Sequence, residues 1–211
     1  LWRSIRQSLS VLSEYQPQVV LGMGGFASGP GAVAARLKGI PLVIHEQNSV
    51  AGTTNRISAR LARRVMQGFP GVFKRGEWCG NPVRPSIANM PTPDMRFAER
   101  TGVVNLLVLG GSRGALAINK ILPQALALID PELRPQVMHQ TGKLHCEKTD
   151  DLYKAAGVEA QVVPFIEKME EAYAWADFAI CRAGALTVAE LTCAGLGSIL
   201  IPFPHAIDDH Q

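Results

Sequence analysis

The segment HEQNSVAGTTNR, residues 45–56, combines a histidine, a carboxylate and several amide side chains over a short distance. It follows the apolar run 40–44, which is typical of a buried parallel strand. Open α/β sheets bind ligands at the carboxyl ends of their strands. His45 and Glu46 could therefore form an acid–base pair, although a histidine after a strand more often has a structural role.

Three glycine-rich turns could hold a phosphate-bearing ligand. They are GMGGFASGP (22–30), GGSRGA (110–115) and RAGALTVAE (182–190), each between a predicted strand and a predicted helix. Glycines let the backbone approach a phosphate closely, and the free N–H groups at a helix start attract negative charge. The alternative for each is a tight turn that binds nothing. Several on one chain favour a ligand between two nucleotide-binding-type domains.

Individual side chains in these segments have specific candidate roles. Pro30 suits the first position of a helix, where its missing N–H costs nothing. Ser112 could donate a hydroxyl or cap a helix. Thr187 and the first-turn N–H groups could hold a diphosphate, while Glu190 could accept two vicinal hydroxyls, as on a ribose, or be a solvated helix residue. Arg84 could bind a phosphate or form a surface salt bridge.

Several function classes are disfavoured by what the sequence contains. GGSRGA does not fit the GxGxxG pattern of NAD-binding proteins, and no GK[ST] of a P-loop occurs. A net charge of +3 is too mild to argue for nucleic acid. The four cysteines lack CxxC or metal-ligand spacing, which favours reduced thiols. No apolar run approaches the ~20 residues that span a bilayer.

Strand-like and helix-like patterns alternate along the chain, which predicts α/β folding with parallel sheets. Proline-rich residues 80–96 interrupt the rhythm, and a strand-turn-helix unit restarts after them. We therefore expect a first Rossmann-like domain at 1–84, a linker at 85–101 and a second at 102–211, with a cleft between the domains. The predicted strands are 18–21, 41–44, 103–109, 136–139, 160–163, 178–181 and 198–202, and the predicted helices include 31–37, 55–64, 115–129, 168–175 and 185–194.

The two ends of the chain predict an internal piece, truncated at both ends. The chain lacks an initiator Met, opens in a helical pattern and stops just after a strand. In the opening segment, Trp2 and Ile5 alternate with Arg3 and Arg6. Such a segment suits an interface with anionic lipid, but packing against another part of the protein is at least as reasonable.

Six motifs together carry a resemblance to a known family. GMGGFASGP, HEQNSVAGTTNR, GNPVR, GGSRGA, RAGALTVAE and PFPHAIDDHQ, in this order, resemble the MurG family of bacterial glycosyltransferases over essentially the whole chain. The resemblance implies the GT-B fold and an inverting transfer without metal or cofactor. It implies that N-acetylglucosamine passes from UDP-N-acetylglucosamine to undecaprenyl-diphosphate-linked N-acetylmuramoyl-pentapeptide, lipid I to lipid II, in peptidoglycan synthesis. It also implies a peripheral enzyme on the cytoplasmic face of the inner membrane.

The resemblance also implies roles for residues of this chain. The turn with Gly22, Gly24, Gly25, Ser28 and Gly29 would face the acceptor's diphosphate, and Trp2 and Ile5 would contact the membrane. His45 and Glu46 would be supporting residues only. The donor-binding residues would be Asn48 on the sugar, Arg84 and Ser112 on the diphosphate region, Ile166 on uracil, Ala185, Leu186, Thr187, Val188, Ala189 and Glu190 on the diphosphate and ribose, and His210 and Gln211 on the sugar.

Two alternatives remain open at this point. The family's GGTGGH loop, whose histidine is the expected base, is not in this chain, so the chain alone is expected to be inactive. A UDP-N-acetylglucosamine 2-epimerase would use the same donor and fold without a lipid acceptor. A non-catalytic nucleotide-binding half of a split GT-B enzyme is the second alternative.

Overall fold

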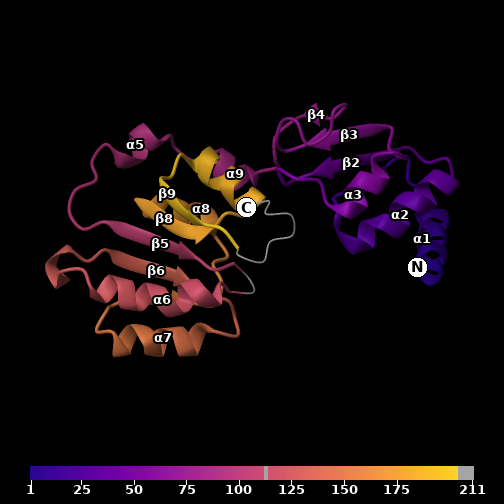
Figure 1. Cartoon of the computed structure of the whole chain (residues 1–211). Coiled ribbons are helices and arrows are strands. Elements are labelled where there is room, and N and C mark those ends of the chain that lie inside the picture. The colour runs from indigo at the N-terminus through magenta and orange to yellow at the C-terminus, as the bar shows by residue number, and fades with distance from the viewer. Residues whose placement is uncertain (112–113, 204–211) are drawn as a thin grey trace. The chain divides into compact units, whose positions relative to one another are not determined.

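The structure is a computed structural model, and it describes residues 1–111 and 114–203. The chain forms two compact units that divide between Pro82 and Val83. Each unit contains a parallel sheet with helices packed against it, as the alternating sequence pattern predicts (Figure 1). The two units are described separately below.

The first unit carries a four-stranded sheet in the order β1-β2-β3-β4, with every neighbouring pair parallel. Two of its strands, β3 and β4, are absent from the sequence prediction, which extended a helix to residue 64. The helix ends at Ser58 and the chain turns into β3 instead. The elements are α1 (Trp2–Tyr15), β1 (Val20–Gly22), α2 (Gly25–Leu37), β2 (Leu42–Glu46), α3 (Thr53–Ser58), β3 (Arg64–Gln67) and β4 (Glu77–Trp78).

Helix α2 provides much of the core of the first unit. Its Ala32 packs with Leu42 and Ile44 of β2, and α1 packs on α2. Ile5 is buried, with 7% of its surface exposed, whereas Trp2 is 75% exposed. The expectation that Ile5 contacts a membrane is therefore corrected, because Ile5 is the buried residue of α1.

The start of α2 also differs from the prediction. Pro30 lies inside the helix, because the helix begins at Gly25. A proline there cannot donate to the carbonyl four residues earlier, so the helix gives up one hydrogen bond. The preceding Gly24 has φ 83°, a left-handed value that favours glycine. This conformation turns the chain so that α2 can begin at Gly25.

The second unit has a five-stranded parallel sheet in the order β7-β6-β5-β8-β9. Helix α7 was not predicted from the sequence. The elements are α4 (Pro85–Ala88), α5 (Pro93–Phe97), β5 (Asn105–Leu109), α6 (Leu116–Ala127), the 3₁₀ turn η1 (Pro131–Leu133), β6 (Gln136–Gln140), α7 (Cys146–Ala155), β7 (Gln161–Val163), α8 (Met169–Trp175), β8 (Phe178–Arg182), α9 (Ala185–Ala194) and β9 (Ser198–Ile201).

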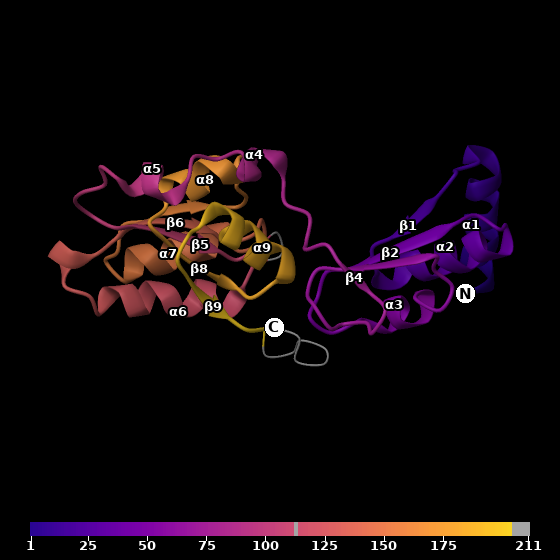
Figure 2. The same cartoon turned by 90° about the horizontal axis from the view of Figure 1, so that it is seen from above.

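Alternating residues of β5 build a separate core on each face of this sheet. Leu106 and Val108 pack with α6 and α7, while Leu107 and Leu109 pack with α4, α8 and α9. Figure 2 shows α8 and α4 on one side of the strands and α6 on the other. The strand order reverses between β5 and β8, and this topological switch point is where open α/β sheets bind ligands.

The segment expected to be a linker, 85–101, is folded onto the second unit. Two of its three prolines, Pro85 and Pro93, start short helices instead of interrupting structure, because proline is compatible with the first helical position. Ile87 is 1% exposed in the core with α8 and α9. Arg100 bonds the carbonyl of Trp175 at 2.7 Å and pairs with Asp177. Apolar burial and these bonds fix the segment.

Candidate functional site

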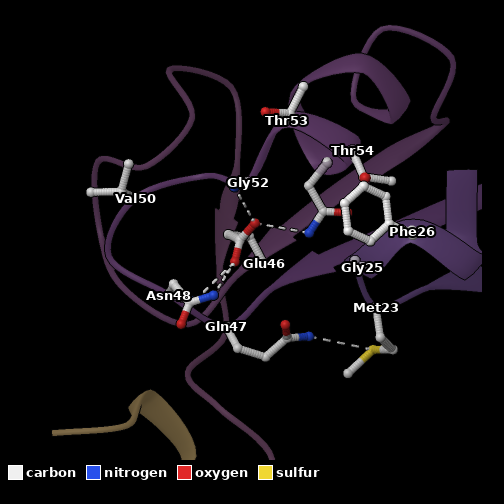
Figure 3. A pocket seen from close by; sticks show the side chains of 12 residues that line it. Met23, Gly25, Phe26, Glu46, Gln47, Asn48, Val50, Gly52, Thr53 and Thr54 are labelled. Carbon is white, nitrogen blue, oxygen red and sulfur yellow. Dashed lines mark hydrogen bonds between the residues drawn. The ribbon is translucent and has the colours of Figure 1, made fainter. Parts of the chain in front are cut away.

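A pocket of about 290 Å³ opens at the carboxyl ends of β1 and β2 in the first unit. Its walls are the turn at residues 23–26 and the loop and helix start at 46–55 (Figure 3). Both segments were singled out in the sequence as ligand-binding candidates. Parallel strands bring them together because consecutive strands place their carboxyl ends at the same edge.

The Glu46 carboxylate organises this pocket. It is 2% exposed. Its Oε1 accepts hydrogen bonds from the backbone N–H and the Nδ2 of Asn48 at 3.0 and 3.1 Å. Its Oε2 accepts from the N–H of Gly52 at 3.1 Å and from Nδ2 of Asn55 at 2.9 Å (Figure 3). Four donors fill the lone pairs of a carboxylate, so Glu46 fixes the loop.

Neighbouring groups contact both ring nitrogens of His45. It is 5% exposed, and its Nε2 lies 2.9 Å from the carbonyl oxygen of Gly80. A carbonyl only accepts, so Nε2 carries the proton. Nδ1 then accepts from Nε2 of Gln47 at 3.3 Å. Both ring nitrogens are engaged within the unit, which gives His45 a supporting geometry for the loop that contains Asn48.

Two glycines without side chains shape the turn after β1. Gly24 and Gly25 both have positive φ, 83° and 75°. A Cβ on Gly24 would lie 3.1 Å from Nδ2 of Asn55, which is tighter than ordinary contact. Phe26 is 98% exposed beside the pocket. Ser28 donates its hydroxyl to the carbonyl of Gly25 at 3.2 Å, which stabilises the first turn of α2.

The remaining residues of the predicted acceptor turn occupy the strand end and the helix. Gly22 is the last residue of β1 and lies against Ile44, and Gly29 lies in α2 against Thr54. Neither glycine has a positive φ. Their importance is therefore close packing of α2 on its neighbours, and the conformational freedom of the turn resides in Gly24 and Gly25.

In the second unit, two turns flank the switch point between β5 and β8. The turn after β5 has Gly111 and Gly114 with φ 72° and 75°. A Cβ on Gly114 would lie 2.3 Å from the carbonyl oxygen of Thr141, so this position requires glycine. The predicted donor residue Ser112 lies outside the described residues, as do His210 and Gln211.

The turn after β8 leads into α9, which begins at Ala185 with Gly184 as its N-cap. The N–H groups at the start of a helix lack intrahelical partners and attract anions. Because β5 and β8 are adjacent, the turns at 110–115 and 183–185 lie at the same edge of the sheet. Ile166 lies in the segment between β7 and α8 and packs against the core of α8 and α9.

Glu190 of α9 has two side-chain partners within the second unit. Nε and Nη2 of Arg84 both lie 3.1 Å from its Oε1, and the hydroxyl of Tyr173 donates to its Oε2 at 3.0 Å. The side chain of Glu190 is 19% exposed and that of Arg84 is 46% exposed. The sequence predicted that Arg84 contacts a phosphate or an acidic partner, and the structure places it on Glu190.

A buried polar network supports the turn after β5. His139 is 0% exposed, and its ring bonds Tyr153 at 3.0 Å and Asn119 at 3.1 Å. Asn119 also donates to the carbonyl of Thr141 at 3.0 Å. Burial lowers the pKa of His139 from 6.5 to about 4. The network ties α6 and α7 to β6 beside the glycine turn.

Three of these residues were missed by the sequence reasoning. Asn55 lies in the polar segment 45–56, which was a usable signal, but no single amide stood out there. Tyr173 lies in helix α8 and His139 in strand β6, and nothing in their spacing distinguishes them from packing residues.

The described residues, 1–111 and 114–203, lack both a metal-binding cluster and a membrane-spanning helix. They contain no group of three or more His, Cys, Asp or Glu side chains that could hold a metal ion. They also contain no helix with the length and apolar character needed to cross a bilayer.

Comparison with known proteins identifies the family. Residues 1–67 match the N-terminal domain of glycosyltransferase family 28, and residues 105–211 match its C-terminal domain. The chain belongs to glycosyltransferase family 28. The family resemblance read from the six motifs is thereby confirmed.

Relatives with curated names agree with this membership. The protein of Dechloromonas aromatica (strain RCB), named UDP-N-acetylglucosamine–N-acetylmuramyl-(pentapeptide) pyrophosphoryl-undecaprenol N-acetylglucosamine transferase, is 55% identical over all of this chain and 60% of its own length. The protein of the same name from Nitrosococcus oceani is 56% identical over 99% of this chain and 59% of its own length. The chain thus spans about 60% of the length of these relatives.

Solved structures show the same fold. MurG of Acinetobacter baumannii is 40% identical with a TM-score of 0.79, covering 98% of this chain and 58% of that one. The UDP-GlcNAc 2-epimerase of Neisseria meningitidis covers 93% of this chain and 62% of that one, with a TM-score of 0.59. At 12% identity this second likeness shows the fold alone. The predicted GT-B class, with two Rossmann-like α/β units, is confirmed.

Proposed function

We propose that this chain belongs to an enzyme that transfers N-acetylglucosamine from UDP-N-acetylglucosamine to undecaprenyl-diphosphate-linked N-acetylmuramoyl-pentapeptide in peptidoglycan synthesis. The observation that carries the proposal is 55% identity over the whole chain to a transferase of that name. The strand-end turns at 22–30, 110–115 and 182–190 and the polar loop at 45–56 offer groups that suit the binding of such substrates. The epimerase alternative lacks comparable support, since its likeness is confined to the fold.

The donor nucleotide is assigned to the switch point of the second unit. The N-terminus of α9, residues 185–189, offers N–H groups to the diphosphate, and Glu190 accepts the ribose hydroxyls. Ile166 would bind uracil through its backbone, and Arg84 would reach the diphosphate region. The further donor residues of this proposal are Asn48 of the first unit and Ser112, His210 and Gln211.

The acceptor's diphosphate is assigned to the pocket of the first unit. The start of α2 presents backbone N–H groups at Gly25 and Phe26, and the absence of a side chain at Gly24 and Gly25 leaves the approach open. A helix N-terminus of this kind favours an anion. The exposed Trp2, with Arg3 and Arg6 on the same helix, would contact anionic lipid on the cytoplasmic face of the inner membrane.

The chemistry proposed is an inverting displacement without metal. The acceptor hydroxyl attacks the anomeric carbon and loses its proton to a base, while UDP leaves from the opposite face. His45 and Glu46 have their acceptor atoms engaged, so we place the base elsewhere. The N-terminus of α9 and Arg84 would stabilise the leaving diphosphate electrostatically, the task that a metal ion performs in other enzymes.

The test is the affinity of the complete protein for UDP-N-acetylglucosamine in calorimetry. Glu190→Ala should weaken binding by ~1–3 kcal/mol, because a charged hydrogen-bond acceptor is lost. Glu132→Ala is the matched control, since Glu132 is exposed on η1 before β6, at the opposite end of the sheet's strands. Equal affinity in wild type and Glu190→Ala would remove the ribose assignment. Transfer that requires the lipid acceptor, measured with labelled sugar, separates this activity from epimerisation.

A further inference from the structure

Tyr173 reaches from the core of the second unit to the candidate donor site. It is 0% exposed on α8, and its hydroxyl donates to Oε2 of Glu190 at 3.0 Å. Its backbone carbonyl accepts from Nη1 of Arg96 at 3.2 Å. Packing and this bond hold the ring in place, so the hydroxyl is a fixed donor beneath the carboxylate.

Burial raises the pKa of the Tyr173 hydroxyl far above its ordinary value, and the neighbouring Glu190 raises it further. The hydroxyl therefore keeps its proton throughout the physiological range. It remains a donor to Glu190 whatever else the carboxylate binds.

Arg84 binds the other oxygen of the same carboxylate, but the Arg84 side chain is partly exposed. Two of its N–H groups, on Nε and Nη2, point to Oε1 at 3.1 Å each. Two donors occupy both lone pairs of that oxygen, whereas Oε2 has a single hydrogen-bond donor within the described part of the chain, the hydroxyl of Tyr173. The Arg84 side chain is 46% exposed at the N-cap of α4, so it can move aside into solvent, which the buried Tyr173 cannot.

A vicinal diol needs one acceptor on each carboxylate oxygen. Oε2 is ready to accept, but Oε1 accepts only when Arg84 withdraws at least one N–H. We propose that Tyr173 is a positioning residue for ribose recognition: it fixes the Glu190 carboxylate while Arg84 gives up Oε1 to the incoming hydroxyl. This inference rests on the proposed function, because it assumes that the ligand of Glu190 is the ribose of a uridine nucleotide.

The experiment compares the affinities of the complete protein for UDP and for 2′-deoxyuridine diphosphate. The ratio of the two affinities measures ribose discrimination and is insensitive to a general loss of folded protein. Tyr173→Phe removes only the hydroxyl and should reduce the ratio by roughly 5-fold, the equivalent of one hydrogen bond of about 1 kcal/mol. An unchanged ratio in a folded Tyr173→Phe protein would overturn the inference.

Tyr153→Phe is the matched control. Tyr153 is 1% exposed in the same unit, and its hydroxyl bonds the ring of His139. The substitution removes an equally buried hydroxyl from the network that supports the turn after β5, so it should lower stability. That turn is assigned to the diphosphate, which both nucleotides carry, so the ratio should stay at the wild-type value. A ratio that falls equally in both variants would show a general loss of packing and would overturn the inference.

Two further variants separate this inference from the proposed function. Glu190→Ala should abolish most of the discrimination, and adding Tyr173→Phe to it should change the ratio no further. If Glu190→Ala leaves the ratio intact, the ribose assignment itself fails. If Glu190→Ala lowers it and Tyr173→Phe does not, only the role of Tyr173 fails.

A further substitution covers the case in which Tyr173→Phe does not fold. Glu190→Asp keeps the charge but shortens the side chain by one methylene, which withdraws the carboxylate from the hydroxyl of Tyr173. Discrimination should fall nearly as far as in Glu190→Ala. Full wild-type discrimination in Glu190→Asp would contradict the need for a carboxylate held against Tyr173.

Discussion

Replacing Glu46 by Gln should destabilise the first unit far more than its small change in shape suggests. Gln turns one acceptor oxygen into an NH₂ group that faces two of the four donors around Glu46. The other two donors lose the charge of the carboxylate. The Asn48 side chain can turn its own carbonyl toward the new NH₂, but the backbone N–H of Asn48 is a fixed donor and would lose its acceptor.

The expected cost follows from these contacts. A hydrogen bond to a charged group contributes about 1.5–3 kcal/mol, and an unsatisfied buried donor costs about 1–3 kcal/mol. With one bond recovered by Asn48, the free energy of unfolding of the first unit should fall by about 2–4 kcal/mol. Donor affinity should fall as well, since Asn48 is released from its place in the loop.

The assay is urea unfolding followed by hydrogen exchange of individual peptides, which measures the first unit separately from the second. Glu77→Gln is the control, because the Glu77 side chain is 61% exposed and its pairing with Arg64 spans 3.8 Å. Such a pair contributes less than about 1 kcal/mol. A Glu46→Gln protein as stable as Glu77→Gln would refute the idea that the carboxylate organises the loop.

Three more outcomes are expected. Because burial holds the pKa of His139 at about 4 in the folded protein against 6.5 when unfolded, the unfolded chain binds the extra proton, and stability should fall as pH drops from about 6.5 to 4. At about 1.4 kcal/mol per pH unit the loss is roughly 3 kcal/mol; His139→Gln should lose this dependence in unfolding curves. Excess EDTA should leave sugar transfer by the complete protein unchanged, and a loss that magnesium restores would contradict the electrostatic argument. His45→Ala should reduce transfer only partly, through the Asn48 loop, and complete loss would make His45 the base.

Much of the fold could be predicted where the apolar pattern of a segment agrees with the residues that begin and end it. The helix at 185–194 was predicted with the bounds that the structure shows, because Gly184 and Gly195 enclose a continuous helical pattern. The strands at 105–109 and 178–182 were also found, since buried parallel strands are long apolar runs. Strand β4, with only Glu77 and Trp78, carries no such signal because both residues are exposed.

The site was predictable as a set of segments but not as a set of contacts. Residues 45–56 stood out because polar groups cluster after an apolar strand. That Glu46 would bond Asn48, Gly52 and Asn55 depends on the path of the loop, which spacing alone does not define. The role of Tyr173 could not be predicted for the same reason, because its hydroxyl meets Glu190 only after α8 and α9 have packed together.

The hydrogen bonds of Glu46 also bear on how the first unit folds. Its hydrogen-bond partners among the residues that the structure describes lie within the next nine residues of the chain, the farthest being Asn55. Closing so short a loop costs little chain entropy, and loops of this size close in roughly 10–100 ns. The loop can therefore form locally once β2 ends and α3 begins, before β3 and β4 join the sheet. The ligand-binding loop can therefore be ordered early in folding, and the rest of the first unit can then assemble around it.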